Sequence, residues 1–250
     1  MQILLSAQSS KSQIRLYGND NGCTIDFLHI LSKSEPKIFI DSRDGKEYKV
    51  VTIGTQTWMA ENLAYLPQVD AVSDGTEMSS GKYYYVYDYV PIGATESVQV
   101  LNAKITSNYQ NYGVLYNWDA AMDGASSSSA NPSNVQGACP DEWHLPSDAE
   151  WTVLANYVGG LDIAGKKLKT NTMGGTDDYS FSTLPAGVRY NQLGDPGDAH
   201  FLTKNESAQF WTSTEEASRS WTRELILGWD KVSRSSANKW NGYSVRCVLD

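Results

Sequence analysis

The residues that most often carry out catalysis or hold metal ions are few in this chain and stand far apart. Its three histidines are His29, His144 and His200, and no His-Glu-x-x-His motif for a catalytic zinc ion occurs. The Gly-x-Ser-x-Gly motif of esterases is also absent, as are the glycine-rich motifs that bind phosphates and dinucleotides. His144 lies between Trp143 and Leu145, a setting that favours a structural role.

Carboxylate chemistry is the reaction type that these patterns leave open. The visible acidic pairs are Asp177-Asp178 and Glu215-Glu216, and both lie in stretches typical of solvated turns. A glycosidase needs two carboxyl groups that are close in space, and these need not be close in sequence. We nevertheless predict that the chain has no catalytic residues and is not an enzyme. We expect no cofactor, although a calcium ion held by backbone carbonyls and scattered Asp or Asn stays an open alternative.

The chain has three cysteines, which are too few for a disulfide scaffold, and no Cys-x-x-Cys spacing for a metal. Cys139 and Cys247 are the natural pair because they lie in two of the most distinctive blocks of the sequence, and Cys23 is then left over. A bridge between them would close a loop of about 110 residues and stabilise the fold by up to about 4–5 kcal/mol. The alternative is a pair of buried free thiols.

Composition and charge limit the classes of partner. Eight Trp and 15 Tyr in 250 residues are many, and amphipathic aromatic side chains suit a recognition surface as well as a core. The net charge is −9 and no basic patch is visible, so we expect no nucleic-acid partner. No apolar run approaches the ~20 residues that span a bilayer, so we expect no membrane insertion. Residues 1–7 do not form a convincing signal peptide.

The pattern along the chain predicts an α+β fold that is irregular and rich in loops, with short antiparallel strands and one or two main helices. Ser147 and Glu150 form a capping box that starts a helix, and Gly159-Gly160 ends it. A second, brief helix is expected over 163–169. Strands are expected over 14–17, 24–30, 38–40, 48–53, 83–90, 179–181, 184–190, 208–213, 220–227 and 243–248.

Six ordered blocks carry a resemblance to a known family. They are residues 48–63, 112–118, 139–151, 184–189, 210–214 and 242–248; examples are Cys139-Pro-Asp-Glu-Trp-His-Leu-Pro-Ser-Asp-Ala-Glu-Trp151 and Gly242-Tyr-Ser-Val-Arg-Cys-Val248. From about residue 41 to the end, the chain resembles the Fibrobacter succinogenes major paralogous domain (FISUMP) family of secreted bacterial modules. Residues 1–40 fall outside the resemblance and are expected to be an N-terminal strand or linker segment, or a truncated partner region.

The resemblance implies a C-type-lectin-like fold, related to formylglycine-generating enzymes and to the variable proteins of diversity-generating retroelements. In that fold the terminal strands pair, a helix follows the Leu-Pro-Ser-x-x-Glu-Trp block, and the sequence before the last Arg-Cys-Val strand forms an exposed binding face. The chain departs from lectins because it has Trp240-Asn241-Gly242 and lacks the Glu-Pro-Asn and Gln-Pro-Asp motifs of calcium-dependent sugar binding. It also departs from the enzymes, because Cys139 and Cys247 match the framework of the fold instead of a reactive pair.

These observations predict a non-enzymatic, adhesin-like or receptor-binding module, secreted or at the cell surface, that takes a protein or glycan ligand. The alternatives are a structural subunit of a surface or fimbrial assembly and an enzyme related to sulfatase-modifying oxidases. The candidate binding residues combine Trp, Tyr and Arg, which dominate binding hot spots, with adaptable polar side chains. They are Trp221, Arg223, Glu224, Trp229, Asp230, Arg234, Ser235, Asn238, Trp240, Asn241 and Tyr243.

Overall fold

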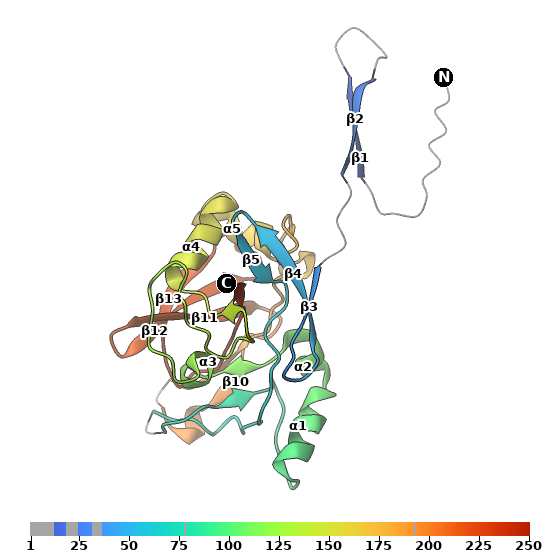
Figure 1. The fold of residues 1–250 in the computed structure, drawn as a ribbon. Helices are drawn as coiled ribbons and strands as arrows, with labels where there is room; N and C mark the ends of the chain where they lie inside the picture. The colour runs from blue at the N-terminus through green and yellow to red at the C-terminus, as the bar shows by residue number, and fades with distance from the viewer. Residues whose placement is uncertain (1–12, 19–24, 32–36, 78, 193) are drawn as a thin grey trace. The chain divides into compact units, whose positions relative to one another are not determined.

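The computed structural model describes residues 13–18, 25–31, 37–77, 79–192 and 194–250, which fall into two units (Figure 1). The first unit contains β1 (Gln13–Gly18) and β2 (Ile25–Leu31), an antiparallel pair where the sequence predicts two strands. Residues 1–7, which the sequence analysis considered as a signal peptide, lie outside the described residues. The second unit runs from Ile38 to Asp250 and is described below.

The second unit mixes helices with mainly antiparallel strands, in agreement with the predicted α+β class. Its helices are α1 (Glu96–Lys104), α2 (Ser107–Tyr112), α3 (Trp118–Met122), α4 (Asp148–Tyr157) and α5 (Leu161–Leu168). The prediction of one or two main helices was too low. Sequence reasoning missed α1 because its apolar side chains do not follow one face, and α2 because it is only six residues long.

Two larger sheets form the framework of this unit. The six-stranded sheet has the order β13-β12-β11-β14-β7-β6 and the five-stranded sheet has the order β3-β4-β5-β15-β8. The strands of the first are β6 (Tyr84–Tyr85), β7 (Leu115–Tyr116), β11 (Ser207–Glu216), β12 (Arg219–Ile226), β13 (Ser233–Asn238) and β14 (Tyr243–Ser244). Those of the second are β3 (Lys37–Ile40), β4 (Glu47–Ile53), β5 (Gln56–Met59), β8 (Trp143–His144) and β15 (Val248–Leu249), and β9 (Val188–Tyr190) pairs separately with β10 (His200–Leu202).

The last block of the sequence belongs to both sheets. β14 pairs with β7 and, in parallel, with β11, and β15 pairs with β5 and β8. Residues 245–247 join the two strands, and Cys247 forms a disulfide with Cys139. The predicted pairing of Cys139 with Cys247 is therefore confirmed, and the expected strand over 243–248 is two short strands instead of one.

Helix α4 begins where the capping box predicts. The Ser147 hydroxyl accepts a hydrogen bond from the Glu150 amide, and the Glu150 carboxylate accepts one from the Ser147 amide at 2.9 Å. Trp151 on this helix packs against Trp58 and Phe210, with ring centroids 4.9 and 5.1 Å apart. The helix thereby connects the two sheets through a buried aromatic cluster.

Two predicted strands are not formed as expected. Over 83–90 only Tyr84 and Tyr85 are extended in a sheet, because a turn follows in which the Tyr89 amide donates to the Val86 carbonyl and Asp88 has a φ of 57°. Residues 179–181 form no strand, since Ser180 has a φ of 56° in a turn that Asp177 closes. Period-two aromatic patterns do not reveal such left-handed turn positions.

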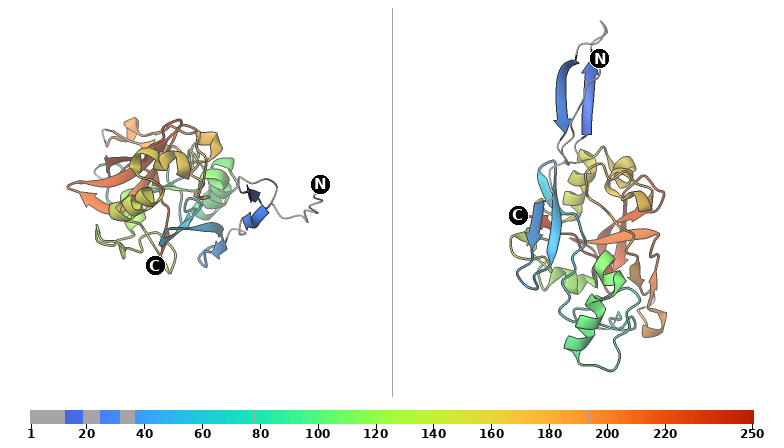
Figure 2. Two further views of the ribbon diagram at one scale, coloured as in Figure 1. Left: turned by 90° about the horizontal axis from the view of Figure 1, so that it is seen from above. Right: turned by 90° about the vertical axis from the view of Figure 1, so that its right-hand side faces the viewer.

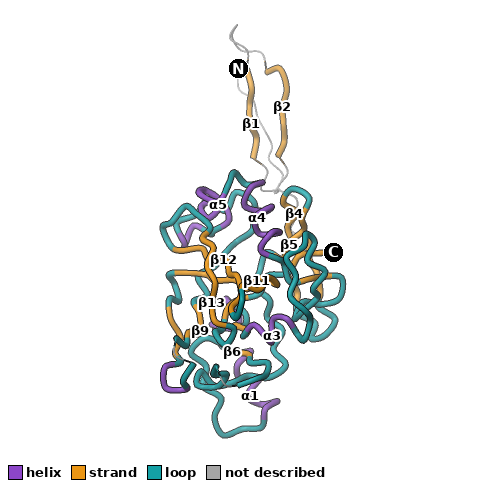
Figure 3. Tube along the Cα trace, turned by 90° about the vertical axis from the view of Figure 1, so that its left-hand side faces the viewer, coloured by secondary structure: helices purple, strands orange, loops and turns teal. Residues whose placement is uncertain are grey.

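Helix α4 lies against β11 and β12 of the six-stranded sheet. Helices α4 and α5 lie at one end of this unit and α1 at the opposite end (Figures 1 and 2). Strands β11, β12 and β13 run side by side next to α4 and α5 (Figure 3). Among the described residues, no helix is both long enough and apolar enough to cross a bilayer.

Removing the disulfide tests how strongly the last block is held. Cys139→Ser together with Cys247→Ser should lower the free energy of unfolding by about 2–5 kcal/mol, because the bridge spans 108 positions of the chain. Urea titration followed by tryptophan fluorescence measures this change. Cys23→Ser is the matched control, and a double variant that is as stable as this control would contradict the prediction.

Candidate functional site

The predicted binding segment is a hairpin and its connections. β12 and β13 pair from Arg219↔Asn238 to Glu224↔Ser233, and the loop 227–232 joins them. Alternate residues of each strand point to opposite sides of the sheet, so the eleven predicted residues cannot share one face. Trp221, Arg223 and Arg234 share one face, while Glu224 and Ser235 lie on the other.

The face toward α4 gathers cations around one carboxylate. Asp148, the first residue of α4, accepts hydrogen bonds from Arg223 Nε and Arg234 Nε, both at 2.8 Å. Arg223 is 1% exposed and also donates to the Asp148 carbonyl and the Thr152 hydroxyl. The Arg234 guanidinium lies 3.5 Å from the centroid of the Trp221 ring, and its side chain is 43% exposed.

Two guanidinium groups share this single carboxylate, so the cluster carries an excess positive charge. Burial lowers the pKa of Arg223, the charge of Asp148 raises it, and the nearby Arg234 lowers it. The N-terminus of α4 adds to the positive potential. Arg223 is therefore a buried support for this face, whereas Arg234 and Trp221 present atoms to solvent.

The loop between β12 and β13 carries a second pair of an aromatic ring and a cation. Trp229 is 49% exposed, and Lys231 Nζ lies 4.8 Å from the centroid of its ring. The buried Lys169 ammonium donates to the carbonyls of Ile226 and Trp229. These two hydrogen bonds hold the backbone of the loop 227–232 at its start. The amide of Lys166 on α5 also donates to the Asp230 carbonyl at 2.9 Å, so a backbone hydrogen bond connects the loop to α5.

Other predicted residues do not lie on an exposed face. Asn241 and Tyr243 are each 2% exposed; the Asn241 amide donates to the Tyr243 hydroxyl, and the Tyr243 ring packs on Trp211 at 4.5 Å. The expectation that Arg223, Asn241 and Tyr243 belong to a surface is thus wrong, because all three fill the interior. Trp240 is half-buried, and its indole donates to the Asn191 carbonyl at 2.8 Å.

The remaining candidates are half-buried or exposed without forming a cluster. Glu224 and Asn238 are half-buried, and burial raises the pKa of Glu224 while the charge of Lys231 lowers it. The Ser235 hydroxyl lies 3.0 Å from the Thr222 hydroxyl. Asp230 is exposed and faces Lys166 at 3.9 Å.

His144 has a structural environment. Its Nε2 lies 2.7 Å from a Glu150 oxygen and its Nδ1 lies 2.6 Å from an Asp250 oxygen, and the ring is 3% exposed. Burial lowers the pKa of His144, but the hydrogen bonds and charges of Glu150 and Asp250 outweigh this effect and raise it overall. Because both ring nitrogens face carboxylates, this environment stabilises the protonated imidazolium form of His144.

The acidic pairs also have local partners. Asp177 accepts hydrogen bonds from the amide and hydroxyl of Ser182 at 2.7 and 2.8 Å. Glu215 forms an ion pair with Lys239. Within the described ranges, no group of three or more His, Cys, Asp or Glu side chains could hold a metal ion.

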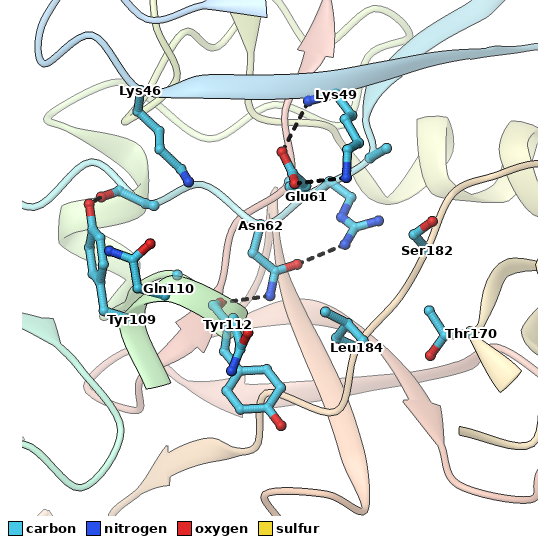
Figure 4. Close-up of a pocket in the computed structure, with 15 residues that line it drawn as sticks. Lys46, Lys49, Glu61, Asn62, Tyr109, Gln110, Tyr112, Thr170, Ser182 and Leu184 are labelled. Atoms are coloured by element: carbon cyan, nitrogen blue, oxygen red, sulfur yellow. Dashed lines mark hydrogen bonds and ion pairs between the residues drawn. The ribbon is translucent and has the colours of Figure 1, made fainter. Parts of the chain in front are cut away.

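Sequence reasoning missed a pocket that lies outside the 219–243 segment. It has a volume of about 150 Å³, and its lining draws on six separate parts of the chain (Figure 4). Lys46, Asn62 and Ser182 contribute to this lining, and so does Arg246, which lies between Val245 and Cys247 in the last block. A charged residue inside an otherwise buried block is the sequence signal that could have indicated it.

Comparison with protein families gives a match over most of the chain. The family described as the Fibrobacter succinogenes major domain matches residues 51–249, which is most of the chain. Searches of curated proteins and of solved structures found no match.

Asp148 is expected to hold the buried Arg223 and the exposed Arg234 in place. Asp148→Ala should cost about 3–5 kcal/mol of unfolding free energy, because it leaves the buried Arg223 guanidinium without its carboxylate beside a like charge. Denaturant titration provides the measurement. Glu215→Ala removes an ion pair between partly exposed side chains and should cost no more than about 1 kcal/mol; equal losses in both variants would refute the assignment.

His144 is expected to make stability depend on pH. Because its pKa is raised in the folded chain, its contribution is fully present below the ordinary pKa of histidine and is lost as pH rises through the folded value. The melting temperature should therefore fall over this range in the wild type, and His144→Gln should flatten the fall. His200→Gln, at an exposed histidine, should follow the wild type; the same pH profile in the His144 variant would count against this account.

Proposed function

The chain belongs to the Fibrobacter succinogenes major domain family, and on this premise we propose that it is a non-enzymatic module that binds a protein or glycan ligand. The binding surface consists of Trp221, Trp229, Lys231 and Arg234, which we call the aromatic–cationic face. All four lie on the β12–β13 hairpin and its loop.

The observation that carries the proposal is the Arg234 side chain. It stacks on Trp221 at 3.5 Å and is tied to Asp148 at 2.8 Å, yet it remains 43% exposed. An exposed cation–π contact stabilises a fold by only about 0.5–1 kcal/mol. A pre-ordered guanidinium and indole are well suited to binding, because little rotamer entropy is lost when a ligand arrives.

The loop supports this proposal for the same physical reason. Trp229 exposes about half of its surface although its backbone is held by Lys169 and by α5. A large aromatic side chain on an anchored turn offers apolar contact area at low entropic cost. Together the four side chains combine aromatic surface with positive charge, which favours an acidic protein patch or an anionic glycan.

We further propose that the fold is C-type-lectin-like. Three features support this relation: β5 pairs with the closing strand β15, α4 follows the Leu145-Pro-Ser147 segment, and an exposed hairpin precedes the last Arg-Cys-Val stretch. A buried disulfide is typical of proteins that function in oxidising compartments, which supports a secreted or surface location.

Arrays of glycans and of extracellular proteins, probed with the purified chain, test the proposal. Trp229→Ala and Arg234→Ala should each weaken binding to any captured ligand by tenfold or more, the size expected for a hot-spot residue. Arg234→Lys keeps the charge but loses the planar stack, so it should also weaken binding.

Tyr157→Ala is the control, because Tyr157 is an exposed aromatic side chain on α4 that lies outside the aromatic–cationic face. It should bind as the wild type does. If every ligand binds Trp229→Ala and Arg234→Ala with unchanged affinity, the aromatic–cationic face is not the binding surface. If the wild type captures nothing, the binding function itself is refuted.

A further inference from the structure

The pocket beside Arg246 has a charge opposite to that of the chain. Of its charged lining residues, Lys46, Lys49 and Arg246 are cationic and Glu61 is anionic, so three minus one gives a net charge of +2. The whole chain carries −9. A concave site with a local excess of positive charge concentrates anions.

Arg246 is the buried cation of this pocket. Its side chain is 1% exposed, and its Cζ atom lies 4.3 Å from the centroid of the Phe181 ring and 5.3 Å from that of Phe210. Burial lowers the pKa of Arg246 to about 9, while the charges of Asp177 and Glu61 raise it, so the group remains a cation at neutral pH. A buried charge without a counter-charge is costly.

The hydrogen bonds of Arg246 go to neutral acceptors. Its Nη2 donates to the Asn62 side-chain oxygen at 2.9 Å and its Nη1 donates to the Phe181 carbonyl (Figure 4 shows the bond at Asn62). Its Nε is buried and has no partner in the described part of the chain. The guanidinium therefore keeps unused donors beside the pocket.

The two carboxylates that raise the pKa of Arg246, Glu61 and Asp177, form hydrogen bonds with other residues. Glu61 accepts the Lys49 amide at 3.0 Å, and Asp177 accepts the amide and hydroxyl of Ser182. Neither forms an ion pair with Arg246 within the described residues. Among the described residues, no carboxylate therefore lies in direct contact with the Arg246 guanidinium, although Asp177 and Glu61 act on it from a longer distance.

Size and lining restrict the anion. A cavity of about 150 Å³ is comparable to one that accommodates a benzene-sized molecule, so it has room for a small organic acid. The lining also includes Ala60, Ala64 and Leu184, whose apolar side chains suit the carbon chain of an organic acid and find no counterpart in inorganic phosphate or sulfate.

We propose that this pocket binds the carboxylate of a small organic acid, with Arg246 as the buried cation and Lys46 as a second cation of the lining. The site is separate from the aromatic–cationic face and does not depend on it. Asn62 positions the guanidinium, because its amide is itself fixed by bonds to the Tyr112 carbonyl and the Ser244 hydroxyl at 3.0 and 3.2 Å.

Isothermal titration calorimetry of the full chain with acetate, succinate and L-glutamate tests this proposal, at constant ionic strength and neutral pH. At least one acid should bind saturably and raise the melting temperature, because a ligand that binds the folded state stabilises it. Inorganic phosphate and sulfate, titrated in parallel, should bind more weakly. Tighter binding of phosphate or sulfate, or no saturable binding of any acid, would overturn the proposal.

Variants show whether binding depends on the pocket residues or only on the overall charge of the protein. Arg246→Gln should abolish binding, and Lys46→Gln, at a half-buried lysine whose loss leaves the core intact, should weaken it several-fold. Lys82→Gln makes the same charge change at an exposed ion pair outside the pocket and should bind as the wild type does. If Arg246→Gln fails to fold, the Lys46→Gln result decides, and binding unchanged by Lys46→Gln refutes the site.

Discussion

The fold depends on one short segment that must belong to two sheets. Tyr243 and Ser244 lie in the middle of the six-stranded sheet, and Val248 lies between β5 and β8 in the five-stranded sheet. Only three residues separate these strands, and Cys247 among them is bonded to Cys139. A segment so constrained fixes where the two sheets meet, and it has no freedom to expose the Arg246 side chain that it carries.

The first turn of α4 organises charge on both of its sides. Glu150 closes the capping box and faces His144, while Asp148 reaches outward to Arg223 and Arg234. A local interaction between residues three apart thereby sets the position of cations that are 75 and 86 residues away. The exposed stack on Trp221 is a consequence of this arrangement, because Asp148 holds Arg234 over the ring.

Buried cations are the common feature of the two candidate sites. Arg223 has a carboxylate partner in the protein, so it serves as a support beneath an exposed face. Arg246 has two neutral acceptors and no carboxylate in contact among the described residues, which is why we propose that an anion completes its environment. The same residue type therefore has different consequences, which follow from whether the protein supplies the opposite charge.

The sequence by itself determined the features that depend on neighbouring residues and on recognisable sequence blocks. Ser147 and Glu150 defined the start of α4, the blocks defined the family, and the positions of Cys139 and Cys247 in two of these blocks indicated the natural pair. Only the tertiary structure decided which residues of 219–243 reach solvent: Trp229 does, whereas Asn241 and Tyr243 pack inside. It also created the Arg246 pocket, where Asn62 meets a residue 184 positions away. Capping and turn preferences act over a few residues, but burial and charge pairing depend on segments that come together only when the sheets close.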